Sequence, residues 1–151
     1  MVREVTAPKE KREIARTILA DLPDWFGIPE STAAYVDGCG EYILYADYEQ
    51  DEAVGFIALK PTSPQTAELY VMGVKKALHR QGIGTKLFEA LRVRAKAAGY
   101  RFLQVKTVAG GCYPQYDRTR MFYEAMGFCA LEVFPTLWDE ANPCLVMVMA
   151  L

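Results

Sequence analysis

Two glycines, Gly82 and Gly84, stand between an apolar run at residues 67–74 and a long amphipathic segment at residues 82–98. The first run is rich in β-formers, whereas aliphatic side chains recur at helical spacing in the second. A helix N-terminus presents unpaired N–H groups and the positive end of its dipole, which favours phosphate. Glycine lets a ligand approach such a backbone closely. The sequence therefore predicts a strand, an anion-binding turn and a helix in succession.

Charge is distributed unevenly along the chain. Residues 75–106 carry nine Lys or Arg and one acid, Glu89, whereas residues 17–59 carry nine acids and no Lys or Arg. We expect the first stretch to attract anions and the second to attract cations. The net charge of −2 argues against a general nucleic-acid-binding protein, which usually has a basic domain.

The remaining patterns indicate a single domain over residues 1–151, without repeats or linkers. Helices are expected at 7–22, 30–36 and 116–126, and strands at 42–48, 53–60, 102–108, 129–134 and 145–149. This order favours a mixed sheet flanked by helices. No apolar stretch approaches the roughly 20 residues of a membrane helix, and no secretory signal is visible, so we expect a cytoplasmic protein without a membrane partner.

The metal-ligating residues are sparse. The four cysteines form no CxxC pair, and His79 is the only histidine. A zinc site is therefore not expected, and we interpret the cysteines as small buried thiols.

Two nucleotide-binding motifs fit the glycine turn poorly. A Walker A loop requires Gly-Lys-Ser/Thr, and this chain has Gly84-Thr85-Lys86. A dinucleotide fingerprint requires a third glycine where this chain has Leu87.

Residues 74–87, Val-Lys-Lys-Ala-Leu-His-Arg-Gln-Gly-Ile-Gly-Thr-Lys-Leu, resemble the acyl-coenzyme-A loop of the GNAT N-acetyltransferase superfamily. Residues 119–128, Thr-Arg-Met-Phe-Tyr-Glu-Ala-Met-Gly-Phe, are similar to the second signature of that family. The resemblance covers about residues 66–128. The chain departs from the family pattern at His79, where Gln or Arg is usual, and at Tyr116, where Asn is common.

The resemblance implies an α/β (α+β) fold with a mixed, mostly antiparallel central sheet of about six to seven strands, flanked by about four helices. It implies an enzyme that transfers the acetyl group of acetyl-CoA to a primary amine by direct attack in a ternary complex, without a metal. It assigns coenzyme binding to Met72, Gly73, Val74, His79, Arg80, Gln81, Gly82, Ile83, Gly84, Thr85, Lys86, Tyr116 and Arg120.

The resemblance also implies two catalytic residues. Tyr123 occupies the position of the acid that protonates the leaving thiolate, and Glu68 matches the base of some relatives. Tyr70 or a chain of water molecules is an alternative base.

The acceptor site is expected among the first two helices and the sheet opening. Trp25, Phe26, Tyr35 and Tyr70 are candidates for its wall, residues 138–143 form a second candidate rim, and the nearby acids favour a cationic amine. Two alternatives stay open, a non-catalytic acyl-CoA sensor of the same fold and a nucleotide-binding oxidoreductase. A homodimer is compatible with the resemblance.

Overall fold

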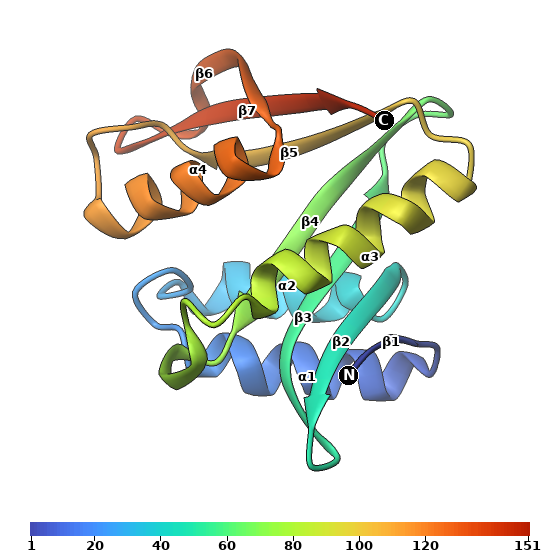
Figure 1. Cartoon of the computed structure of the whole chain (residues 1–151). Helices are drawn as coiled ribbons and strands as arrows, with labels where there is room; N and C mark the ends of the chain where they lie inside the picture. Colours follow the sequence, from blue (N-terminus) through green and yellow to red (C-terminus); the bar gives the residue numbers. More distant parts are fainter.

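The computed structural model describes residues 1–151 and contains one seven-stranded sheet with the order β1-β2-β3-β4-β5-β7-β6 (Figure 1). The strands are β1 (Val2–Val5), β2 (Ile43–Glu49), β3 (Glu52–Pro61), β4 (Thr66–Val74), β5 (Phe102–Val108), β6 (Cys129–Asp139) and β7 (Asn142–Ala150). Only β4 and β5 pair in parallel. The expected fold class is confirmed.

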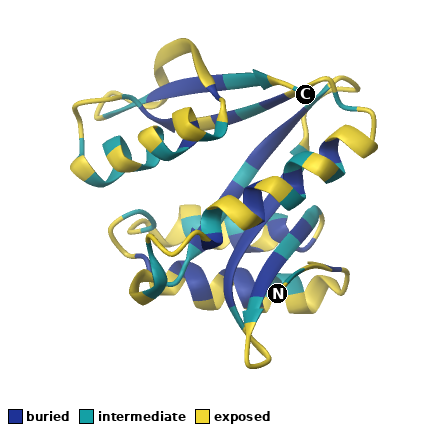
Figure 2. Cartoon of the chain, in the orientation of Figure 1, coloured by how far each residue is buried: buried dark blue, intermediate teal, exposed yellow.

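Four α-helices flank the sheet: α1 (Pro8–Ala20), α2 (Pro29–Cys39), α3 (Ile83–Ala97) and α4 (Pro114–Met126). Helix α1 buries Ile18 and Leu19 in a cluster with Phe56 of β3. Helix α3 buries Leu87 and Phe88 in a second, larger cluster. Helices α1 and α3 each keep one buried side and one exposed side (Figure 2), as their apolar spacing requires, whereas α4 buries only Tyr123. No helix has the length and apolar character needed to cross a membrane.

An extra residue in β4 divides the sheet. Ala58 of β3 faces Val71 and the next residue faces Leu69, so Tyr70 has no partner and forms a β-bulge. Bulges bend a strand and increase its twist. Strand β4 pairs with β5 only through Thr66, Ala67 and Glu68, and beyond Glu68 the two strands have no paired residues. Figure 1 shows them diverging. The fold thereby creates an opening in the middle of its own sheet.

Several boundaries differ from the sequence-based expectations. Strand β1 was not predicted, because its Val-Arg-Glu-Val sequence is short and half polar, and pairing with β2 stabilises it. Helix α2 extends to Cys39, and β6 and β7 reduce the predicted 138–143 rim to a two-residue turn. The prediction that all four cysteines are buried is wrong for two of them: Cys39 and Cys144 are buried, whereas Cys112 and Cys129 are exposed.

Candidate active site

A cavity of about 1050 Å³ occupies the opening between β4 and β5. Its walls come from six parts of the chain: the α1–α2 connection, α2, β4 with the glycine turn and the start of α3, β5, α4, and the β6–β7 turn. This volume lies at the upper end of ordinary ligand pockets. We refer to this space as the cleft and to residues 79–85 as the donor loop.

The donor loop leads into the first turn of α3. Gly82 has a φ of +81°, a left-handed conformation that favours glycine, and an added Cβ there would meet no atom within 4 Å. No side chain caps the N-terminus of α3. The first amide of this helix with a backbone partner is that of Lys86, which donates to the Gly82 carbonyl. The amides of Ile83, Gly84 and Thr85 are therefore available to an anion in the cleft.

The end of β4 supplies a second set of backbone groups. Met72, Gly73 and Val74 all line the cleft, on the side of β4 that has lost its pairing with β5. A Cβ at Gly73 would lie 3.0 Å from side-chain atoms of Ile18 and Leu22, so the close approach of α1 requires glycine there. An extended ligand with amide groups can bind such a free edge as an added strand does.

Tyr123 lies on α4 and is buried between Phe122 and Phe128, whose ring centroids are 5.8 and 5.9 Å from its own. The Tyr123 hydroxyl forms no hydrogen bond within the protein, yet no fully buried side-chain oxygen lacks a partner. The hydroxyl is therefore accessible, and because Tyr123 lines the cleft, it faces the cavity. Burial raises the pKa of Tyr123 well above its ordinary value, with a smaller contribution from Tyr35 and Tyr116. The phenol is therefore protonated at neutral pH.

Glu68 is buried beside the last paired residues of β4 and β5. Its Oε1 accepts a hydrogen bond of 2.8 Å from Gln104 Nε2 and lies 3.1 Å from Lys106 Nζ. Its side chain does not line the cleft, whereas Lys106 does. The Glu68 carboxylate is therefore buried, and its charge is balanced by Lys106 inside the protein.

Aromatic rings line the part of the cleft nearest α2, and all four predicted acceptor residues are among its lining residues. Tyr35 forms edge contacts with Phe26 and Tyr70, with centroids 6.0 and 5.2 Å apart. Burial raises the pKa of Tyr70 to about 12, with smaller effects from neighbouring groups. We call Trp25, Phe26, Tyr35 and Tyr70 the acceptor wall.

The structure brings most, but not all, of the predicted coenzyme residues to the cleft. Ten of the thirteen line it, and Gln81, Lys86 and Arg120 do not. Lys86 Nζ lies 3.7 Å from Asp47. Arg120 turns back over Gly110 and pairs with Glu124, its Nε lying 3.6 Å from the carboxylate.

Other lining residues were not among the predicted sites. Lys106 and Thr107 come from β5, and Thr119 comes from α4. The candidate rim at residues 138–143 does reach the cleft, through Trp138, Asp139 and Asn142. The sequence did not indicate that residues of β5 would line a cleft. A strand pattern predicts the strand itself, but it does not reveal that the neighbouring strand stops pairing with it.

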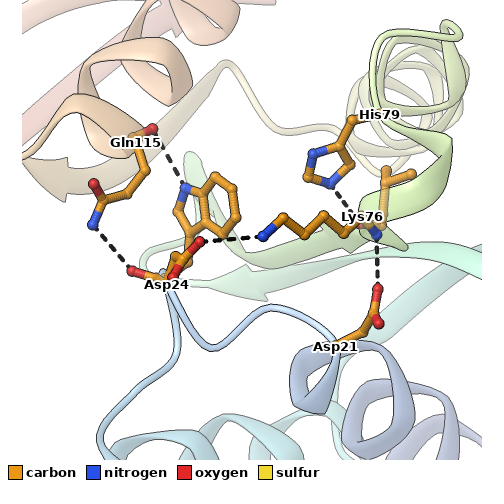
Figure 3. Close-up of polar contacts among 7 residues, drawn as sticks. Asp21, Asp24, Lys76, His79 and Gln115 are labelled. Atoms are coloured by element: carbon orange, nitrogen blue, oxygen red, sulfur yellow. Dashed lines mark hydrogen bonds and ion pairs between the residues drawn. The ribbon is translucent and has the colours of Figure 1, made fainter.

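Figure 3 shows how the α1–α2 connection is held beside the donor loop and α4. Asp21 Oδ2 accepts a hydrogen bond of 2.7 Å from the Lys76 amide, and Asp24 pairs with Lys76 Nζ at 3.5 Å. His79 Nε2 donates to the Val74 carbonyl at 2.7 Å. On the other side, Gln115 Nε2 donates to the Asp24 carbonyl at 3.1 Å.

Comparisons with known proteins agree with this geometry. The Acetyltransferase (GNAT) domain family matches residues 39–130. A probable N-acetyltransferase 14 from Xenopus tropicalis is 39% identical over 66 residues, which are 43% of this chain and 32% of that protein. The chain therefore matches about a third of the length of this relative.

Two solved structures have the same fold. A GNAT-family acetyltransferase from Desulfovibrio desulfuricans has a TM-score of 0.85 and 20% identity, over 99% of this chain and 98% of that one. An aminoglycoside 6'-N-acetyltransferase complexed with coenzyme A has a TM-score of 0.78 and 21% identity, over 99% and 96% of the two chains.

Proposed function

This chain belongs to the GNAT acetyltransferase family, and we propose that it is an acetyl-CoA-dependent N-acetyltransferase. In this proposal the acceptor is a primary amine of a small molecule or peptide, which attacks the thioester directly in a ternary complex. The observation that carries the proposal is the donor loop, whose free amides open onto a large cleft in a divided sheet.

The donor loop fits a pyrophosphate in charge and in shape. The amides of Ile83, Gly84 and Thr85 and the dipole of α3 favour an anion, and Arg80 adds a cation at the cleft. The open space in front of Gly82 leaves room for the phosphate oxygens. The coenzyme A complex of the aminoglycoside acetyltransferase supports the same kind of ligand here.

The free edge of β4 provides donors for the rest of the coenzyme. We propose that Met72, Gly73 and Val74 bind the extended pantetheine arm through backbone groups. An N–H of this segment would stabilise the negative charge that develops on the thioester oxygen, because a fixed donor in a partly dry site costs no reorganisation.

Tyr123 is the proposed acid. Its raised pKa keeps the proton on the phenol, so the hydroxyl can donate to the sulfur as the thiolate leaves. A thiol has a pKa of about 8.5, so complete proton transfer from Tyr123 is unfavourable and the thiolate leaves partly unassisted. We therefore expect a contribution to rate from Tyr123, rather than an absolute requirement.

Glu68 remains the proposed base, acting on the amine through water. A primary amine has a pKa of about 10 and must lose a proton before attack. Tyr70 is a poor acceptor of that proton, since its own pKa of about 12 keeps it protonated. The Glu68 carboxylate lies 3.1 Å from Lys106 Nζ, and Lys106 lines the cleft, so water at Lys106 can connect Glu68 to the amine.

The acceptor wall suits an amine carried on an apolar body. Aromatic faces attract cations and bury apolar area at the same time. Asp139 lines the same cleft and places a negative charge at its rim, whereas Asp24 is already paired with Lys76.

The test has two parts. Calorimetric titration with coenzyme A should show binding, and release of free thiol from acetyl-CoA should depend on an amine from a broad panel. Tyr123→Phe should lower kcat with little change in coenzyme affinity, and Glu68→Gln should also lower kcat while leaving coenzyme affinity unchanged. Tyr100→Phe, the same chemical change outside the cleft, is the matched control and should leave both values unchanged.

One observation favours a second candidate, a non-catalytic acyl-CoA sensor of the same fold. The carboxylate of the proposed base is already paired with Lys106 and Gln104. Tight coenzyme binding without thiol release across the whole amine panel would favour the sensor and contradict the enzyme.

A further inference from the structure

The connection between α1 and α2 forms part of the cleft along its whole length. Every residue from 22 to 28 lines the cavity, including two members of the acceptor wall, Trp25 and Phe26. Of these seven residues only Leu22 is fully buried. The position of the 21–28 segment is therefore set mainly by the contacts of its polar and aromatic groups with neighbouring elements.

On one side the segment contacts the donor loop and the turn before it. Asp21 accepts a hydrogen bond from the Lys76 amide at 2.7 Å. The ring of Trp25 meets the ring of His79 edge to face, with centroids 5.7 Å apart. His79 is itself fixed to the end of β4 by its bond to the Val74 carbonyl. A ligand that restrains the donor loop thus restrains the surface against which Trp25 packs.

On the other side the segment is bound to the first two turns of α4. Trp25 Nε1 donates to Thr119 Oγ1 at 3.2 Å, and the Trp25 carbonyl accepts from the Tyr116 hydroxyl at 2.7 Å. Trp25 is therefore a residue at which contacts from both sides of the cleft meet; Asp24 beside it also contacts both sides, through Lys76 and Gln115, but its side chain is exposed and it belongs to no aromatic wall. His79 and Tyr116, its partners on the two sides, are the positions at which the sequence departs from the family motifs.

We propose that Trp25 is a positioning residue that couples coenzyme binding at the donor loop to the rigidity of the acceptor wall. Binding at the donor loop holds His79, His79 holds the indole ring, and α4 holds the indole N–H and the carbonyl from across the cleft. Coupling of this kind is reciprocal, so the fixed wall also retains the coenzyme. The inference rests on the proposed function, since it requires that coenzyme A binds the donor loop.

Hydrogen exchange tests the coupling with coenzyme A alone as the probe. Saturating coenzyme A should slow amide exchange in residues 21–28 by about fivefold or more in the wild-type chain. Trp25→Phe and Tyr116→Phe each remove one hydrogen bond between Trp25 and α4 while keeping an aromatic ring. In both variants the slowing should fall below about twofold, whereas the donor loop should still be protected by coenzyme A.

Tyr113→Phe is the matched control, because Tyr113 lines the same cleft and packs on Tyr116 without contacting Trp25 by a hydrogen bond. It should behave as the wild-type chain does. If coenzyme A binds by calorimetry and leaves exchange of residues 21–28 unchanged, the coupling is refuted and the proposed function stands. If coenzyme A slows exchange of residues 21–28 in both test variants as much as in the wild-type chain, Trp25 does not couple the two sites. Failure of coenzyme A to bind at all would overturn both proposals.

Discussion

Replacement of Gly82 by alanine separates the conformational role of this residue from its role at the ligand site. The φ of +81° costs an L-residue about 1–2 kcal/mol, and part of this is offset because alanine restricts the unfolded chain. No atom lies within 4 Å of the new methyl group, so no clash adds to the cost. We expect the free energy of unfolding to fall by about 1 kcal/mol, which lowers Tm by about 2–4 °C in a domain of this size.

The effect on coenzyme binding should be larger. The methyl group would stand in the open space that we assign to the pyrophosphate and would displace it from at least one amide. A hydrogen bond to a charged group contributes about 1.5–3 kcal/mol, so the Kd for coenzyme A should rise by about 10- to 150-fold. Calorimetry at a temperature well below Tm measures this change directly.

Gly99→Ala is the matched control for Gly82→Ala. Gly99 has a φ of +91° and an equally open Cβ position, but it follows the opposite end of α3, about 22 Å away along the helix, and does not line the cleft. It should lose the same stability and keep the Kd of the wild-type chain. If both variants bind coenzyme A within about twofold of wild type, the donor loop does not hold the pyrophosphate.

Two further predictions concern stability. Phe88→Ala removes a fully buried ring of α3 that packs on Phe128, and it should lower the free energy of unfolding, measured in urea, by about 3–5 kcal/mol. Val93→Ala on the exposed side of the same helix should change it by less than about 0.5 kcal/mol. Equal effects would contradict the assigned burial. Burial raises the pKa of Tyr123, so above pH 10 the unfolded chain loses this proton before the folded chain does. The free energy of unfolding should therefore fall as pH rises past about 10. Tyr123 contributes up to about 1.4 kcal/mol per pH unit to this fall, and Tyr123→Phe should lack that contribution. Identical pH slopes in the two proteins would contradict a raised pKa.

The sequence was most informative where a local pattern determines the structure. The limits of β5 at Phe102 and Val108 were predicted correctly, because β-forming residues extend from just after Arg101 nearly to the Gly110-Gly111 pair. Gly127, with a φ of +112°, ends α4 as expected. The glycines of the donor loop likewise predicted a turn before α3, which begins one residue later than expected.

Residues whose roles depend on distant partners were harder to predict. Glu68 was assigned from its place on a strand, but its environment is set by Gln104 and Lys106 on β5. Arg120 lies within a family signature, yet its contacts with Asp117 and Glu124 direct it away from the cleft. No local pattern encodes such pairings, since they arise only when separate elements meet.

The single unpaired position in β4 has a consequence for how this protein tolerates change. The divided sheet follows from the number of residues between Leu69 and Val71, and the chemistry of the one side chain there is secondary. Substitution of Tyr70 alters a wall and leaves the division in place. Deletion of the same residue would bring β4 into continuous register with β3 and leave the later side chains opposite their present partners, but it would remove the bulge that bends β4 away from β5, so we expect the cleft to narrow. The space for a ligand therefore depends on the length of β4 at this point more than on which side chain stands there.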